Sequence, residues 1–177
     1  MELQRLGVKF FAADPASIRL EDIIPIFHGW IQQQAVAGHL LIDVHDYSHI
    51  QGGPGILLVA HEGNFSVDMS EGRPGLFYYR KIQTALPPIE HMSAIVKSAL
   101  DACHRLEKET KVRFKMDEIV VIANDRLSAP NDDAAFAELR SVVAAALENA
   151  IPGSAFNLTR ISSNPKDRLA IGCKSSM

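Results

Sequence analysis

The stretch from His39 to Ile82 constrains the fold more than any other part of the chain. It contains three strand-like runs, HLLIDVHDYSHI, ILLVAHEGNFSVDM and LFYYRKI, separated by glycine-rich turns at 51–55 and 71–75. Strands joined by such short connections are antiparallel neighbours, because a parallel crossover needs a dozen or more residues. The segment therefore predicts three consecutive strands of an antiparallel sheet.

Apolar residues recur at helical spacing in three other segments. The first predicted helix begins with Asp22 as its cap, carries Pro25 in its first turn and ends near Gly38. The remaining predicted elements are helices at 90–109 and from Asn131 or Asp132 to about Asn149, and strands at 8–13, 117–123, 155–161 and 168–174.

These elements predict an α+β fold, with three helices packed on a largely antiparallel sheet, in one domain over residues 1–177. The order strand, helix, strand, strand occurs in both 8–82 and 113–174, and the first strands end similarly in FFAADP and VIANDR. A duplicated β-α-β-β unit explains this order. The alternative is a single βαββαβ-type sandwich with an extra strand and a terminal αββ extension.

Composition narrows the class of protein. A hydrophobic content of 47% is typical of a globular chain, and a net charge of -3 disfavours a dedicated nucleic-acid binder. No apolar run reaches membrane-spanning length, and the start, MELQRLGVKFF, does not resemble a signal peptide. Cys103 and Cys173 lie far apart on apolar patterns, which predicts buried free thiols. We expect a cytoplasmic protein without nucleic-acid or membrane partners.

Strand alternation gathers polar residues on one sheet face. A hairpin that turns between Gly52 and Gly53 sets Asp43 opposite Glu62, with His45 opposite Ala60 and diagonal to Glu62. A second hairpin near Gly72 sets Lys81 opposite Asn64, and Tyr79 opposite Ser66. The same six side chains are therefore expected on one face: Asp43, His45, Glu62, Asn64, Tyr79 and Lys81.

This face has two interpretations. It is either the solvent-exposed face of an antiparallel sheet or a ligand-binding or catalytic site. As a catalytic site, His45 would be the general base, Glu62 the acid or orienting group, and Asp43 the group that fixes the imidazole tautomer, with one carboxyl pKa raised. Lys81 and Tyr79 would hold an anionic or carbonyl oxygen, and Asn64 would contact the ligand.

Neither a metal site nor a cofactor is indicated. His45 and His49 are about 13 Å apart along a strand, too far to share one ion. No phosphate-binding, dinucleotide-binding or nucleophile motif occurs in the chain.

The outer face is also expected to carry apolar residues, including Ile56, Leu58 and Phe77, which predicts a homo-oligomer. The sequence thus favours a protein that binds a small polar ligand or a protein partner on its sheet face. The alternative function is an enzyme that performs proton transfer or hydrolysis on the same face.

Overall fold

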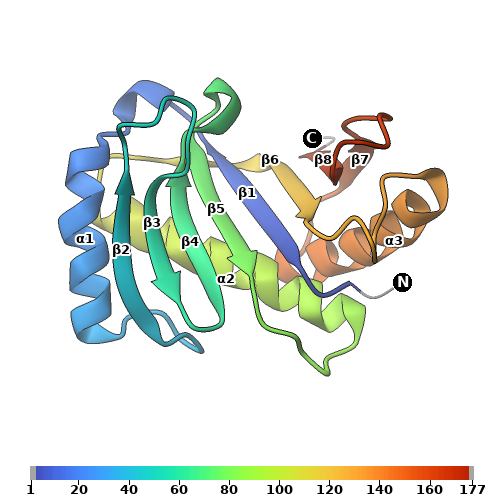
Figure 1. Cartoon of the computed structure of the whole chain (residues 1–177), viewed down its shortest axis with the longest axis horizontal. Coiled ribbons are helices and arrows are strands. Elements are labelled where there is room, and N and C mark those ends of the chain that lie inside the picture. Colours follow the sequence, from blue (N-terminus) through green and yellow to red (C-terminus); the bar gives the residue numbers. More distant parts are fainter. Residues whose placement is uncertain (1–2, 176–177) are drawn as a thin grey trace.

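The computed structural model describes residues 3–175 and contains one eight-stranded antiparallel sheet and three α-helices (Figure 1). The strands lie in the order β2-β3-β4-β5-β1-β6-β8-β7. In chain order the elements are β1 (Leu6–Ala12), α1 (Leu20–Gln33), β2 (Leu41–Tyr47), β3 (Gly55–Ala60), β4 (Gly63–Asp68), β5 (Gly75–Arg80), α2 (Pro88–Glu109), β6 (Phe114–Ala123), α3 (Asp133–Ala150), β7 (Phe156–Arg160) and β8 (Leu169–Ser175).

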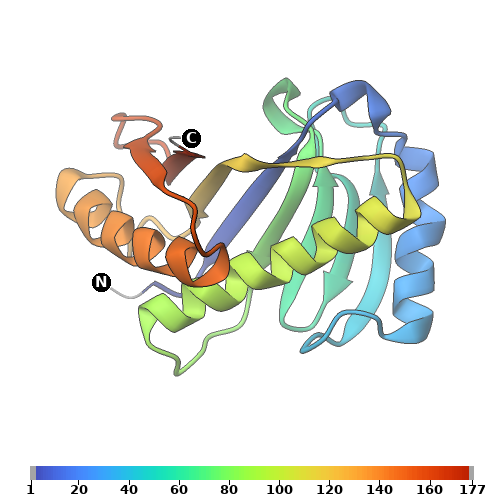
Figure 2. The ribbon, with the colours of Figure 1, turned by 180° about the vertical axis from the view of Figure 1, so that it is seen from behind.

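The helices cover one face of this sheet (Figure 2). Helix α1 packs on β2 and β3, α2 on β1 and β5, and α3 on β7, β8 and α2. The apolar side chains beneath them, such as Phe10, Phe65 and Ile119, are fully buried. The predicted α+β class, with three helices on an antiparallel sheet, is therefore confirmed, and within residues 3–175 the opposite face carries no α-helix.

Strand β1 lies near the middle of the sheet, between β5 and β6, and all seven of its residues are buried. Val8 and Phe10 face the helices. Lys9 and Phe11 alternate with them, so their side chains lie on the open face, yet each is only 6% exposed. The open face is therefore recessed around β1.

The predicted strand over the run ILLVAHEGNFSVDM is wrong, because the structure folds it into the hairpin β3–β4. His61 and Glu62 form the turn. Ile56 and Leu58 before the turn, and Phe65 after it, all face the helices and are fully buried. Neither turn residue has a positive φ, so the turn lacks the glycine or asparagine signal that marks most two-residue hairpins.

The extra turn also changes which side chains face outward. Ile56 and Leu58, expected on the outer face, are fully buried beneath the helices, as is Leu41 at 3% exposure. Leu57 lies on the open face and lines its groove with Phe77. Two of the apolar residues that motivated the homo-oligomer are thus buried, while Leu40, Ile42 and Ile50 are about half exposed, and the oligomer stays a prediction.

Helix α1 differs from its prediction at both ends. It begins at Leu20, without a side-chain hydrogen bond from its N-cap Arg19, and Pro25 lies inside it. It ends at Gln33 because Gln34 adopts the left-handed conformation at φ 46°. The Gln34 amide then donates to the Leu41 carbonyl and accepts from the Leu41 N–H, each at 3.0 Å. The Gln34 side chain thus satisfies backbone hydrogen-bonding groups at the outer edge of β2, as a neighbouring strand would.

A buried histidine and two buried cysteines lie on the helix side of the structure or in its strands. His91 is buried on α2, where its Nε2 lies 3.2 Å from the Gln4 carbonyl oxygen. Burial lowers the pKa of His91. Cys103 and Cys173 are buried free thiols, as predicted, and burial raises the pKa of Cys173 to about 12.

The strand order bears on the duplication hypothesis. β1 and β6, the first strands of the two halves, are antiparallel neighbours in the sheet. Each pairs on its other side with the last strand of its own half, β5 or β8. The duplication itself stays a prediction.

We expect Gln34→Leu to lower the free energy of unfolding by about 1–2 kcal/mol, because two hydrogen bonds to the β2 backbone are lost. Urea unfolding would measure the change. The matched control is Gln33→Leu on the exposed side of the same helix turn, which should change stability little. Equal unfolding midpoints for the two variants would show that the edge contact is not stabilising.

Candidate functional site

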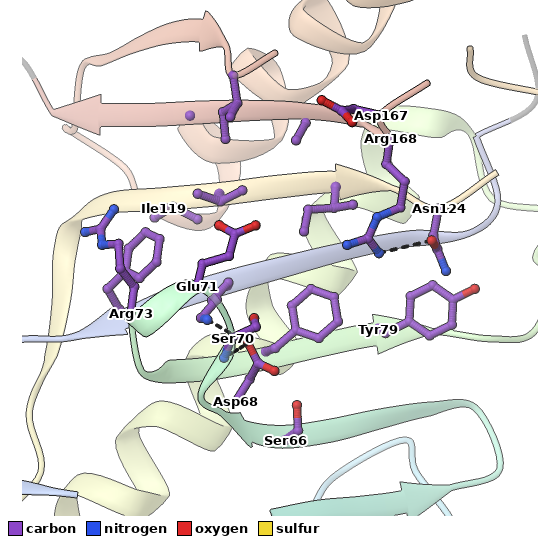
Figure 3. Close-up of a pocket in the computed structure, with 18 of the residues that line it drawn as sticks. Ser66, Asp68, Ser70, Glu71, Arg73, Tyr79, Ile119, Asn124, Asp167 and Arg168 are labelled. Carbon is purple, nitrogen blue, oxygen red and sulfur yellow. Dashed lines mark hydrogen bonds and ion pairs between the residues drawn. The ribbon is translucent and has the colours of Figure 1, made fainter. Parts of the chain in front are cut away.

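The open face of the sheet contains a groove of about 1100 Å³ (Figure 3). Its floor is formed by residues of β4, β5, β1, β6 and β8, and its rim by the turn after β4 and the loop between β7 and β8. The polar lining residues of most interest are Lys9, Asn64, Ser66, Asp68, Ser70, Arg73, Glu118 and Arg168.

A buried ion pair lies on this floor. Lys9 Nζ lies 2.6 Å from Asp68 Oδ2, and the two residues are 6% and 9% exposed. Lys9 is on β1 and Asp68 on β4, so the pair spans β5 at Gly75, which pairs with Asp68 on one side and Phe11 on the other. A Cβ atom on Gly75 would clash with the Phe10 carbonyl oxygen of β1, so glycine is required where the pair crosses the intervening strand.

Asp68 and Lys9 differ in how completely their hydrogen-bonding capacity is used. Asp68 Oδ2 also accepts hydrogen bonds from the hydroxyl and backbone N–H of Ser70. Lys9 Nζ has three N–H donors, and within residues 3–175 only Asp68 accepts from it. Lys9 Nζ also lies over the Phe11 ring, 5.6 Å from its centroid, and its remaining N–H groups have no hydrogen-bond acceptor among these residues.

A second charged cluster closes one end of the groove. Glu118 on β6 accepts hydrogen bonds from Arg73 at 3.0 Å and from Lys115 at 2.9 Å. Arg73 and then Lys115 lower the pKa of Glu118 to about 2. The Arg73 guanidinium also stacks on Phe11, with 3.6 Å between its Cζ and the ring centroid. These contacts fasten the turn after β4 to the central strands.

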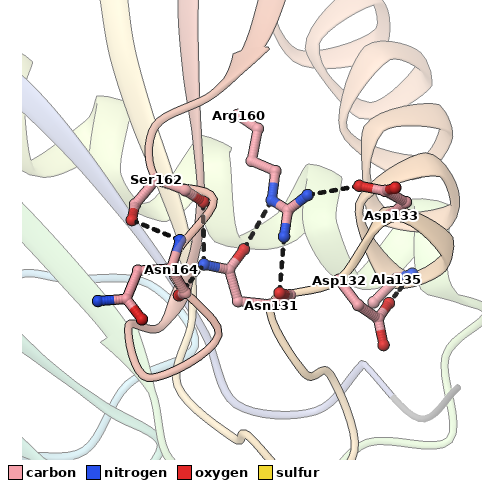
Figure 4. A network of polar contacts seen from close by, with 7 residues as sticks. All are labelled: Asn131, Asp132, Asp133, Ala135, Arg160, Ser162 and Asn164. Atoms are coloured by element: carbon pink, nitrogen blue, oxygen red, sulfur yellow. Dashed lines mark hydrogen bonds and ion pairs between the residues drawn. The ribbon is translucent and has the colours of Figure 1, made fainter.

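The rim at the opposite end is held by a buried asparagine (Figure 4). Asn131 is 3% exposed, and its Nδ2 donates to the carbonyl oxygens of Ser162 and Asn164. Arg160 donates to the Asn131 side chain and carbonyl, and its Nη1 contacts Asp133 at 2.7 Å. The network ties the β7–β8 loop, which ends at Arg168 just before β8, to the N-terminus of α3.

Between these ends the floor is aromatic. Tyr79 and Phe77 project from β5 beside Gly7 of β1. A Cβ atom on Gly7 would lie 2.6 Å from the Phe77 ring, so a larger residue at this position would displace the ring from its place beside β1. Ala170 and Gly172 extend the floor on β8 with little side-chain bulk. The groove can thus receive a flat apolar group against Tyr79 and Phe77.

Two of the predicted ligand-binding residues lie in this groove, and one does not. Asn64 and Tyr79 are directly opposite each other and both line it. The predicted register was two residues off, since Ser66 faces Phe77 and not Tyr79, but a shift of two residues keeps every side chain on its face. Lys81 follows β5, where its N–H donates to the Glu62 carbonyl, and it does not line the groove.

The predicted cluster of Asp43, His45 and Glu62 is not formed. Asp43 lies opposite Val59 and His45 opposite Leu57. Glu62 is in the turn after β3, about 16 Å along the strand from the level of His45. The prediction failed because it extended β3 through this turn and overlooked the irregularity between Leu41 and Asp43.

The local contacts of these three residues are modest. His45 Nε2 lies 3.6 Å from Asp43 Oδ2, and both side chains are about half exposed. Glu62 accepts a hydrogen bond from the Leu40 N–H at 2.8 Å. Desolvation raises the pKa of Glu62, but two backbone hydrogen bonds and the nearby His39 and His61 outweigh desolvation, so the pKa of Glu62 is lowered. The catalytic roles of these residues stay predictions.

The sequence does not predict Lys9 or Asp68 as site residues. A signal was present, because Lys9 is the single charged residue within the apolar run Val8 to Ala13. A lysine in a strand buried on both faces needs a partner. The partner could not be named, since Asp68 lies 59 residues away and on a non-adjacent strand.

Comparison of the chain with known protein families, with curated proteins and with solved structures finds no match. Over residues 3–175, no helix has the length and apolar character needed to cross a membrane. The same residues contain no group of three histidine, cysteine, aspartate or glutamate side chains placed to hold a metal ion. The groove is therefore the feature of this protein that bears on its function.

We expect Glu118→Gln to lower the free energy of unfolding by about 2 kcal/mol at neutral pH, after allowance for the half-exposed Arg73. The folded pKa of about 2 lies below the unfolded value, so this stability is present above roughly pH 4.5 and is lost as the pH falls toward 2. Urea unfolding as a function of pH would measure it. Glu71→Gln, on the same rim, should show no such pH-dependent difference, and a parallel response in both variants would contradict the assignment.

Asn131→Ala should loosen the rim specifically. It removes two hydrogen bonds to the β7–β8 loop and one from Arg160. The substitution should therefore accelerate amide exchange at residues 162–168 more than it accelerates exchange in β1. Native-state hydrogen exchange would resolve the two regions. Asn149→Ala on α3 serves as the control, and uniform acceleration over the whole sheet would argue against a local role.

Proposed function

We propose that this protein binds a small polar ligand in the open-face groove, at the Lys9–Asp68 pair. The observation that carries the proposal is a buried, incompletely used ion pair on the floor of a cavity. This retains the function expected from the sequence, ligand binding on the sheet face, but centres it on different residues.

Energetics support a role beyond stability. Removing two charges from water is expensive, and well-packed apolar residues in place of a buried ion pair are often as stable or more so. Lys9 and Asp68 are almost inaccessible on the floor of the groove, beside the rings of Phe11 and Phe77, where apolar side chains could take their place. A ligand that accepts hydrogen bonds from Lys9 would give the pair a function that apolar residues lack.

A second polar group of the groove also supports the proposal. Asn64 Oδ1 is buried and has no hydrogen-bond partner within residues 3–175. Buried acceptors of this kind are normally satisfied. Asn64 lies four residues from Asp68 on β4, about 13 Å along the strand, so a ligand that reached both would contact Lys9 with an acceptor at one end and Asn64 with a donor at the other.

An acid–base enzyme is the second candidate function. The observation that favours it is the hydrogen-bonded chain from Lys9 through Asp68 to the Ser70 hydroxyl, because such a chain can move a proton within a sheltered cavity. The function still requires a ligand in the groove, so binding is tested first.

We expect a thermal-shift screen of carboxylates, phosphates, sugars, amino acids and nucleosides to yield ligands that raise the Tm of the wild type. The double variant Lys9→Met/Asp68→Asn should lose this shift because both charges are gone. It should nevertheless remain folded, whereas Lys9→Met alone should lose about 3 kcal/mol by leaving Asp68 buried without its cation.

Lys97→Met, at an exposed position of α2, is the control and should respond to ligands like the wild type. Circular dichroism would verify that the double variant is folded before binding is compared. The proposal fails if no compound stabilises the wild type, or if a stabilising compound acts equally on the double variant.

A further inference from the structure

The charge of the groove differs in sign from that of the whole chain. Six of its lining residues are lysine or arginine and four are aspartate or glutamate, an excess of two positive charges. The chain as a whole carries a net charge of -3. Positive charge has therefore been concentrated on this face, where low-dielectric walls strengthen its field.

The cations are also unevenly compensated. Lys9 and Arg73 each have a carboxylate partner, Asp68 and Glu118. The other four, Arg126, Lys166, Arg168 and Lys174, have no ion pair within residues 3–175. Lys174 lies opposite Glu118, whereas Arg126, Lys166 and Arg168 lie at the end formed by the β7–β8 loop, together with Asp167. That end therefore carries three cations against one carboxylate.

Two of these cations are held by neutral oxygens. Arg168 Nη1 donates to Asn124 Oδ1 at 3.1 Å, and Arg126 Nη1 donates to the Lys166 carbonyl at 2.6 Å. These bonds restrain the guanidinium groups without neutralising them. The loop that precedes Arg168 is itself anchored by Asn131 (Figure 4). A fixed guanidinium with free N–H groups binds carboxylate or phosphate well.

The aromatic floor lies beside this charged end. In Figure 3 the Arg168 guanidinium points into the groove on the same side as Tyr79, with Asn124 next to it. Phe77 and Tyr79 offer ring surface there, and Gly172 and Ala170 keep the opposite floor low. A flat ring on this floor would place a substituent near Arg168.

We infer that the ligand of this groove is a planar aromatic anion, with its ring against Phe77 and Tyr79 and its carboxylate or phosphate at Arg168 and Arg126. This inference rests on the proposed function and names its ligand class. The charged groups of the Lys9–Asp68 pair would contact a second substituent on the ring.

Matched probes test the inference. Heteronuclear NMR titration of the full chain would compare naphthoate with naphthamide, and adenosine monophosphate with adenosine, at low ionic strength. In at least one pair the anion should bind about tenfold more tightly than its neutral counterpart, as expected for charge-assisted hydrogen bonds. Preference within the first pair identifies a carboxylate ligand, and preference within the second a phosphate ligand.

Arg126→Gln/Arg168→Gln should reduce that preference to about onefold, since both guanidinium groups are removed. Lys97→Gln/Arg140→Gln, which removes the same charge from exposed helix positions, should keep it. The inference is overturned if neither anion binds better than its neutral partner, if the arginine variant keeps the preference, or if none of the four probes binds at millimolar concentration. The proposed function is decided separately, by the metabolite screen and the Lys9/Asp68 double variant.

Discussion

Burial of strand β1 on both faces is the constraint on which the rest of the structure depends. Its helix-facing residues, Val8 and Phe10, join the main core. Its other residues, Lys9 and Phe11, lie on the face without helices and are nevertheless almost inaccessible. A lysine in that position must find a counter-charge in a medium where isolated charge is very unfavourable. Asp68, reached across Gly75, supplies it.

The groove follows from how neighbouring segments cover that strand. At one end, Arg73 stacks on Phe11 and binds Glu118, which brings the turn after β4 over the sheet. At the other end, Asn131 and Arg160 hold the β7–β8 loop. Segments from both halves of the chain thus form the walls, and the cavity exists only because the two halves share one sheet. Binding in the groove would therefore couple to the stability of the whole domain.

Polar residues at the β2 edge serve a different purpose from those in the groove. The Gln34 side chain hydrogen-bonds to the N–H and carbonyl groups of Leu41, and the Asp43 carboxylate accepts a hydrogen bond from the Val44 N–H at 2.8 Å. An edge strand with free N–H and C=O groups invites pairing with other chains, and side-chain capping with added charge reduces that tendency. Asp43 and His45, which looked like catalytic groups in the sequence, belong to this exposed edge.

The sequence by itself determined the class of the fold, most of its elements and the face on which Asn64 and Tyr79 lie. Hydrophobic periodicity and glycine turns are local signals, and side-chain direction along a strand repeats every two residues. The β3–β4 turn was not predicted because its residues, His61 and Glu62, do not adopt a positive φ. Together with the irregularity between Leu41 and Asp43, this missed turn explains why Glu62 does not lie opposite Asp43. Only the tertiary structure brought Lys9 to Asp68 and Arg168 to the aromatic floor. Such pairs join distant segments through the strand order, which no local pattern encodes.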